Sequence, residues 1–312
     1  MEIQSLKQAI GASLEYILTR QLADGSWVDW DLPPGASDIW TTAFVGCKLT
    51  SVDIRQNPKV NAAIRAASKW LLSSVLDDTG WGYNASVGSD ADSTAHAILF
   101  LSSQGCKVPL KSYARLRQFQ SPDGGFSTYC VCGQKSSWVV SHPDVSPVAL
   151  LALLTKYSRN EPFITNGVEY IFRQRTSAGL WNSFWWNSFL YSTNANLSLL
   201  DALGASVETD GMLATLLDFT PCNAFEAALQ LECMSFTNSP SEGPRICQLV
   251  EQLLREQEPD GSWKSKPILR ITKRDCFEPW DAPDPGLQFA DPNRLFTTST
   301  IVEALSKLQQ SR

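Results

Sequence analysis

Two acidic residues, Asp90 and Asp92, stand one residue apart in the segment Ser89–Ala95. A buried carboxyl group beside a second carboxylate tends to stay protonated, and in that form it can donate a proton as a general acid. His96 follows Asp92 by four residues, so the two side chains share one face of a helix that begins near Ser93. Acidic residues here equally suit a structural role, because carboxylates cap helix N-termini and interact with the helix dipole. The segment therefore indicates either proton donation or helix capping.

Histidine occurs only twice in the chain, as His96 and His142. Chemistry that requires several imidazoles is therefore nearly excluded. Both histidines are candidate partners of Asp92, and both also suit a purely structural role. The eight cysteines include no C-x-x-C pair and lack the usual spacing of a structural zinc site, so no metal site is expected.

Length and composition limit the class of protein. The 312 residues contain no stretch of 18 consecutive apolar residues, which excludes a membrane-spanning helix. A formal net charge of −6 without a basic run argues against nucleic acid and allows at most a peripheral contact with a membrane. The segment from Met1 to Gln21 is polar and does not resemble a secretory leader, so a cytoplasmic protein with reduced thiols is expected.

A turn with a glycine followed by an aromatic residue recurs along the chain. The segments are Gln21–Trp27, Asp77–Trp81, Gln120–Phe126, Arg175–Trp181 and Gln257–Trp263. Apolar residues at helical spacing precede each turn, and the glycine supplies the helix stop. The spacing predicts five or six units of about 50 residues, with the turn aromatics packed between helices rather than in a cavity.

A second, polar phrase follows each turn and introduces a more apolar run. The phrases are Ser37–Ala43, Ser89–Ala95, Ser141–Pro147, Ser188–Asn194 and Asn293–Ser299. Their Ser and Thr residues are expected to cap the helices that follow. Alternating amphipathic and apolar helices predict two concentric layers. The expected fold is all-α, a single α/α toroid over residues 1–312 whose inner helices begin at one end of a central cavity.

The fourth residue of each polar phrase should occupy an equivalent place around that cavity. These residues are Trp40, Asp92, Asp144, Tyr191 and Phe296. A degenerate unit at residues 220–225 is expected to contribute Cys222 or Asn223, without a fixed register. The result is a mostly aromatic ring that carries two carboxylates.

The Asp90-Ala-Asp92-Ser-Thr-Ala phrase and the Gln…Asp-Gly-Ser-Trp turns together resemble the class II terpene cyclases, the squalene-hopene and diterpene cyclase superfamily. Members carry Asp-x-Asp-Asp, or Asp-x-Asp-Thr-Thr in the drimenyl diphosphate branch, and the middle Asp protonates an alkene or epoxide. By position that residue is Asp92, while Ser93 in the fourth position brings the chain closer to the second variant. The resemblance covers most of the chain. Members usually join two such domains or add another catalytic one, and this chain has room for one.

The resemblance implies cyclisation of a linear prenyl chain that is free, diphosphorylated or attached to another group. Asp92 would be the acid, Asp90 would help to keep it protonated, and His96 or His142 would orient it. Aromatic faces would stabilise the migrating cation by about 0.5–2 kcal/mol each and exclude water. The candidate wall residues are Trp40, Asp144, Trp185, Trp186, Tyr191 and Phe296. No cofactor is implied, except Mg²⁺ if the substrate is a diphosphate.

Two other interpretations stay open. A zinc enzyme like the related protein prenyltransferases needs a later histidine, and none follows His142. A non-catalytic toroid that binds a lipid or a protein partner would explain the repeats equally well. The long segment Lys264–Asn293 is expected to be a lid, and its cations at Arg270, Lys273 and Arg274 suit either a diphosphate or a surface charge cluster.

Overall fold

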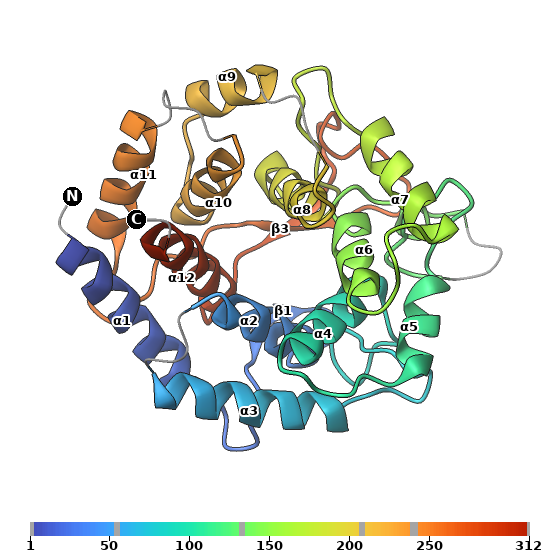
Figure 1. The fold of residues 1–312 in the computed structure, drawn as a ribbon, viewed down its shortest axis with the longest axis horizontal. Helices are drawn as coiled ribbons and strands as arrows, with labels where there is room; N and C mark the ends of the chain where they lie inside the picture. Colours follow the sequence, from blue (N-terminus) through green and yellow to red (C-terminus); the bar gives the residue numbers. More distant parts are fainter. Residues whose placement is uncertain (1–2, 53–56, 131–134, 206–209, 238–242, 311–312) are drawn as a thin grey trace.

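The structure is a computed structural model that describes residues 3–52, 57–130, 135–205, 210–237 and 243–310. Its helices alternate between two concentric layers (Figure 1). The outer helices are α1 (Ile3–Thr19), α3 (Pro58–Ser73), α5 (Leu110–Arg117), α7 (Pro162–Arg173), α9 (Asp210–Asp218) and α11 (Gly243–Glu256). The inner helices are α2 (Ile39–Thr50), α4 (Ala91–Ser103), α6 (Ser146–Leu154), α8 (Phe189–Ala202), α10 (Ala224–Ser235) and α12 (Leu295–Gln310). The predicted α/α toroid is confirmed.

Both layers close on themselves. Each inner helix packs against the next, and α12 returns to α2. In the outer layer α1 contacts α3 on one side and α11 on the other. Contacts between the two ends of the chain therefore complete the ring (Figure 1). None of the helices in the described ranges is long and apolar enough to cross a membrane.

The two layers differ in how much of each helix they bury. In α6, apolar on nearly every face, all but two residues are buried. In α11 only Leu249, Val250 and Leu253 are buried, which form one stripe at helical spacing. This difference matches the apolar and amphipathic segments of the sequence, because an inner helix has neighbours all round and an outer helix has them on one side.

The turn aromatics are fully buried between the layers, as predicted. In four of them the indole N–H donates to the main-chain oxygen ten residues earlier, at 2.7–2.9 Å: Trp27 to Ile17, Trp81 to Leu71, Trp181 to Ile171 and Trp263 to Leu253. The Gln side chains that open three turns reach the next outer helix: Gln21 donates to Ala63 O, Gln120 to Phe163 O and Gln257 to Ala9 O. The motif thus clamps each turn to its own helix and to the neighbouring unit.

The hydroxyl groups of the polar phrases mostly do not cap helices, which corrects the sequence-based expectation. In four units the hydroxyl two residues beyond the ring position accepts the backbone N–H of the turn aromatic, as Thr94 Oγ1 does from Trp81 at 3.0 Å. The capping side chains are Asp38, Asp90 and Asn223, together with one hydroxyl group of the phrases, that of Ser188. The reason is geometric, since a residue inside the first turn faces the preceding loop rather than its own free N–H groups.

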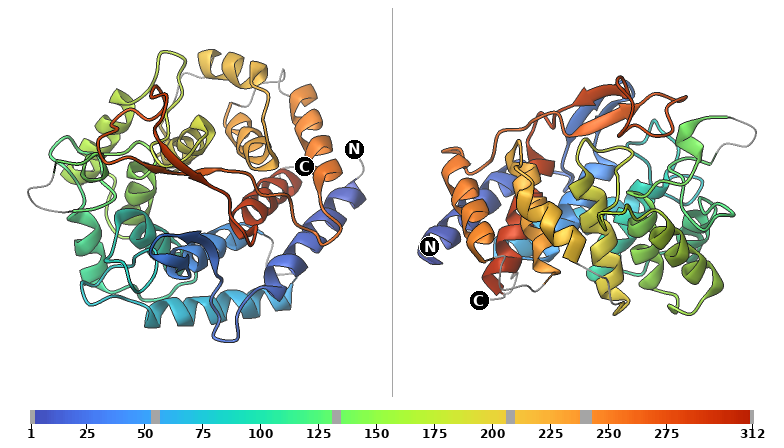
Figure 2. Two further views of the ribbon diagram at one scale, coloured as in Figure 1. Left: turned by 180° about the vertical axis from the view of Figure 1, so that it is seen from behind. Right: turned by 90° about the horizontal axis from the view of Figure 1, so that it is seen from above.

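Two antiparallel hairpins lie across the end of the toroid where the inner helices begin (Figure 2, right). The first joins β1 (Asp29–Leu32) to β2 (Gly35–Ser37), and the second joins β3 (Leu269–Thr272) to β4 (Gly286–Phe289). The register of the first hairpin shifts between Asp29 and Asp31, and Trp30 at the shift has a positive φ of 55°. This bulge turns the Trp30 side chain into the buried core, where 1% of it is exposed.

Candidate active site

The acidic pair lies at the start of α4. Asp90 caps the helix, because its Oδ1 accepts the Ser93 N–H and its Oδ2 accepts the Ser93 hydroxyl, both at 2.7 Å. Burial, reinforced by the charge of Asp92, raises the pKa of Asp90 to about 7. Asp92 stands in the first turn, and its side chain is 15% exposed. Asp90 therefore serves as the cap of α4, and the carboxyl group of Asp92 is not used for capping.

His96 lies beside Asp92, as the spacing predicts. Its Nδ1 is 2.9 Å from the main-chain oxygen of Asp92 and 3.4 Å from the carboxylate Oδ1. The imidazole packs against Phe44, with ring centroids 5.4 Å apart, and is buried. A proton on Nδ1 therefore points at two oxygens of the same residue.

His142 is engaged away from Asp92. Its Nε2 lies 2.7 Å from Ser137 O and its Nδ1 lies 2.9 Å from the Thr128 hydroxyl. Burial lowers the pKa of His142 to about 4, so the ring is neutral at neutral pH, with the proton on Nε2. Thr128 Oγ1 in turn accepts the Trp185 indole N–H at 2.7 Å. This chain of bonds corrects the expectation that His142 partners Asp92, because both ring nitrogens are already used to hold Thr128 and Trp185.

Asp144 is the second carboxylate of the ring. Its Oδ2 accepts the backbone N–H groups of Phe184 and Trp185 at 2.8 and 2.7 Å. Its Oδ1 is buried and has no hydrogen-bond partner among the described residues. Burial raises the pKa of Asp144 to about 6, against the effect of the Trp185 N–H and the Arg270 charge.

Arg270 is neither a surface cation nor free to bind a diphosphate, which corrects both expectations for it. It is 5% exposed, and its guanidinium donates to the carbonyl oxygens of Ser183 and Phe184 at 2.6–3.1 Å. Lys273 pairs with Asp284. Arg274 lies over the Trp138 ring, 4.9 Å from its centroid.

The carboxylates of Asp90, Asp92 and Asp144 face a narrow chamber beneath the hairpins. Its volume is about 80 Å³. The lining is mostly apolar and aromatic apart from its carboxylates: Leu32, Trp40, Tyr83, Asp90, Asp92, Ser93, Thr128, Tyr129, Asp144, Val145, Trp185, Trp186, Leu269 and Ile271. An outer cavity of about 390 Å³ adjoins it and shares the residues Leu32, Tyr83, Tyr129 and Ile271. Together the two reach the size of small-molecule sites, about 300–1,000 Å³.

Only some of the predicted aromatics line the chamber. Trp40, Trp185 and Trp186 do. Tyr191 and Phe296 instead pack against Trp186, with centroids 4.0 and 6.1 Å away, which corrects their placement in the wall. The reason is that Trp186, bridged to Leu269 of β3, occupies the middle of the ring.

Sequence reasoning missed further residues of this cluster. Phe225 occupies the sixth ring position and stacks on Trp186 at 5.5 Å. Asn223 caps α10 and Cys222 is exposed, which corrects the register of the degenerate unit. Aligning the Asn223 cap with the Asp90 cap would have identified Phe225. Other missed residues lie outside the inner helices: Trp30, Tyr83, Tyr129, Leu269 and Ile271.

The segment Lys264–Asn293 covers the chamber, as expected for a lid. Its strand β3 contributes Leu269 and Ile271 to the lining, and Arg274 borders the outer cavity. Among the residues that the structure describes, no three His, Cys, Asp or Glu side chains gather into a potential metal site.

The toroid is the fold of the type II terpene cyclases. No protein-family model matches the sequence, and no curated protein matches it. Among solved structures, the type II terpene cyclase MstE from Scytonema is 23% identical with a TM-score of 0.88, over 100% of both chains. A variant of MstE in complex with the substrate geranylgeranyl dihydroxybenzoate is 22% identical with a TM-score of 0.87, over 99% of both chains. The ent-copalyl diphosphate synthase from Streptomyces platensis is 17% identical with a TM-score of 0.61, over 86% of this chain and 50% of that one.

Proposed function

We propose that this protein is a type II terpene cyclase. It is an intramolecular lyase or isomerase that cyclises a linear prenyl or meroterpenoid polyene after Asp92 protonates a terminal alkene or epoxide. The observation that carries the proposal is the position of Asp92, in the first turn of an inner helix and facing a chamber lined with Trp40, Trp185 and Trp186.

The acidic pair explains how a carboxyl group can hold its proton. Burial and the neighbouring charge of Asp92 raise the pKa of Asp90 to about 7, so full ionisation of the pair is disfavoured near neutral pH. Asp90 accepts two hydrogen bonds from Ser93, and such bonds favour the ionised form of Asp90. The carboxyl of Asp92 is not used as a cap and faces the chamber, so the proposal assigns the donated proton to Asp92, with the His96 imidazole beside it on the next turn of α4.

The indole faces of the chamber suit the second part of the reaction. A carbocation within reach of an aromatic ring gains about 0.5–2 kcal/mol per ring and meets few nucleophiles. Stabilisation of the carbocation by aromatic rings needs no resident cofactor. Mg²⁺ would accompany the substrate only if that substrate is a diphosphate. Because hairpins of the same chain cover the chamber, the proposal does not require a second domain.

The substrate we propose is a hydrophobic isoprenoid. MstE has been described with geranylgeranyl dihydroxybenzoate as substrate and merosterolic acid A as product, so a prenylated aromatic acid is a suitable first probe. The cysteines that the structure describes are free thiols, which suits the cytoplasm as the place of action.

Purified protein incubated with farnesyl diphosphate, geranylgeranyl diphosphate and geranylgeranyl dihydroxybenzoate tests the proposal. Chromatography coupled to mass spectrometry should separate a cyclic isomer of the substrate that Asp92→Asn no longer forms, since this near-isosteric change removes the acidic proton. Cyclic products that persist in Asp92→Asn would remove Asp92 as the acid. Tight binding of the polyenes without any turnover would instead favour a non-catalytic lipid-binding toroid.

A further inference from the structure

Besides the Asp90–Asp92 pair, a third carboxylate faces the chamber, and the initiation step does not use it. Asp144 occupies the ring position next to Asp92, at the start of the neighbouring inner helix α6, and 1% of it is exposed. Its Oδ1 has no hydrogen-bond partner among the described residues. A buried carboxylate oxygen that is left unpaired costs free energy, so its retention calls for a function.

The Asp144 side chain is held rigidly. Its other oxygen is fixed by the N–H groups of Phe184 and Trp185. Arg270 clamps the same segment from its carbonyl side, through bonds to Ser183 O and Phe184 O. These contacts leave the Asp144 Oδ1 in a fixed place and supply a compensating positive charge nearby.

The charge state also suits a proton acceptor. With a pKa of about 6, Asp144 is predominantly a carboxylate at neutral pH. The other polar groups of the lining are less suited. Both oxygens of Asp90 accept bonds from Ser93, and Thr128 Oγ1 is engaged by His142 and Trp185. A phenol such as Tyr83, whose pKa burial raises further, is not a base at neutral pH.

We propose that Asp144 is the base that ends the cyclisation. Its Oδ1 takes a proton from a carbon next to the final carbocation, the electrons of that C–H bond form a C=C bond, and Asp144 becomes a neutral acid. Asp92 has given one proton at the start and Asp144 receives one at the end, so the product is an isomer of the substrate. The enzyme resets when Asp144 loses its proton to solvent and Asp92 regains one. This inference rests on the proposed cyclase function.

The test is the product mixture of Asp144→Asn. The amide oxygen of Asn can still accept the N–H groups of Phe184 and Trp185, so the fold is retained while the base is lost. The polyene should still be consumed, but the wild-type alkene should fall at least tenfold relative to water-captured alcohols and isomeric alkenes. A purely structural role would change the rate or the stability and leave this ratio unchanged.

The matched control is Asp29→Asn. Asp29 is also a buried carboxylate that accepts backbone N–H groups, from Trp30, Asn293 and Leu295, but it does not line the chamber. Its product ratio should equal that of the wild type. If Asp144→Asn fails to fold, Asp144→Ser is read in the same way, because its hydroxyl can accept an N–H but is not a base at neutral pH.

An unchanged product ratio in a folded Asp144 variant overturns the inference, and so does complete loss of consumption, since the last base should not block the first protonation. Wild type and Asp92→Asn are assayed in parallel. No turnover by wild type on any polyene means that the cyclase proposal fails. Wild-type turnover with unaltered Asp144→Asn products means that only the role of Asp144 fails.

Discussion

The imidazole Nδ1 of His96 lies 2.9 Å from the main-chain oxygen of Asp92 and 3.4 Å from its Oδ1. One N–H group thus faces both the backbone and the carboxyl of the residue one turn earlier. Packing of the His96 ring on Phe44 fixes the direction of that N–H group. The acid is therefore oriented from within its own helix.

His96→Ala should lower turnover by about 10- to 150-fold, because it removes the Nδ1 group that lies 3.4 Å from Asp92 Oδ1, and a polar contact with a carboxyl group that becomes charged contributes about 1.5–3 kcal/mol. The effect should fall on kcat rather than on KM, since His96 does not line the chamber. Steady-state kinetics on the best polyene measure it, with circular dichroism to confirm folding. Wild-type kcat in a folded His96→Ala protein would refute an orienting role.

The ring could be predicted to the extent that the repeats are regular. Asp92 and Trp40 stand at equivalent positions of their polar phrases, and both line the chamber. Phe225 was missed because its unit, around Pro221, lacks the glycine and aromatic turn that sets the register elsewhere. A local alignment identifies a position only where the local motif is present.

The rest of the site depends on contacts between distant segments. Trp30 enters the core through a bulge with positive φ, and Ile271 enters from a strand near the end of the chain. Neither feature has a helical period or a repeated motif. The burial of Arg270 depends likewise on carbonyl groups that lie more than 80 residues away in the sequence.

Trp186 sets the size of the chamber in this structure. It stacks on Tyr191 and Phe225 and lies 6.2 Å from the Trp40 ring, so it fills space in which a longer chain would lie. Trp186→Leu should raise turnover of geranylgeranyl relative to farnesyl substrates by about tenfold, since two more buried methylene groups contribute about 1.6 kcal/mol. Competition assays with both chain lengths measure the ratio. Tyr191→Phe, which opens no space, serves as the control, and an equal ratio in both variants would exclude this role.

The contact between the turn Gln257–Trp263 and helix α1 can be tested by substituting two glycines. Gly261 has φ +88°, and a Cβ there would lie 2.3 Å from Ala12 O, whereas a Cβ at Gly11 in α1 meets nothing within 4 Å. Gly261→Ala should destabilise the protein by more than about 1 kcal/mol, through strain and displacement of α1. Gly11→Ala should stabilise it by about 0.5–1 kcal/mol. Urea unfolding of both variants gives the two signs, and stabilisation by Gly261→Ala would contradict the tight contact.

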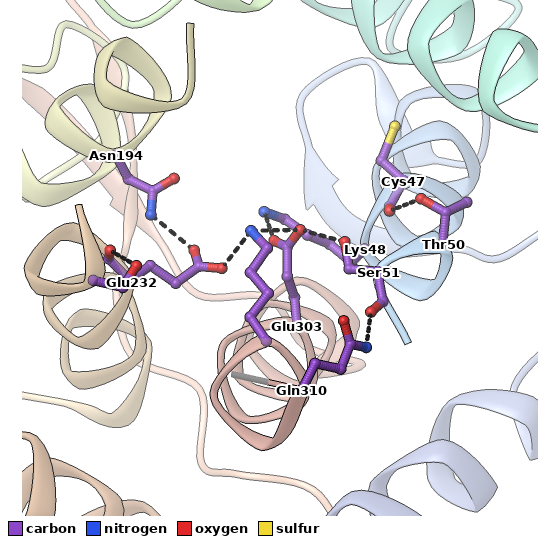
Figure 3. A network of polar contacts seen from close by, with 10 residues as sticks. Cys47, Lys48, Thr50, Ser51, Asn194, Glu232, Glu303 and Gln310 are labelled. Carbon is purple, nitrogen blue, oxygen red and sulfur yellow. Dashed lines mark hydrogen bonds and ion pairs between the residues drawn. The ribbon is translucent and has the colours of Figure 1, made fainter. Parts of the chain in front are cut away.

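A largely buried network of charged and polar side chains joins four inner helices (Figure 3). Glu303 of α12 pairs with Lys48 of α2 and lies 3.1 Å from Lys307. Lys307 also lies 2.8 Å from Glu232 of α10, and Asn194 of α8 donates to Glu232 at 2.8 Å. The network connects the helices that close the inner ring, at the end away from the hairpins.

Glu303→Gln should destabilise the protein by about 3 kcal/mol at pH 7, because it leaves the largely buried Lys48 without its carboxylate, whereas the more exposed Lys307 keeps Glu232. Despite burial, Lys48 and Lys307 lower the pKa of Glu303 from 4.5 to about 2. A group whose pKa falls on folding stabilises the protein above its unfolded pKa and loses that contribution as the pH falls through its folded pKa. The difference in unfolding free energy between wild type and Glu303→Gln should therefore shrink from pH 4.5 towards pH 2. Urea titrations across this range measure it.

Glu15→Gln, at the exposed Lys59 pair, should change stability by about 0–1 kcal/mol. A difference that is constant with pH would show that the Glu303 charge does not stabilise the ring.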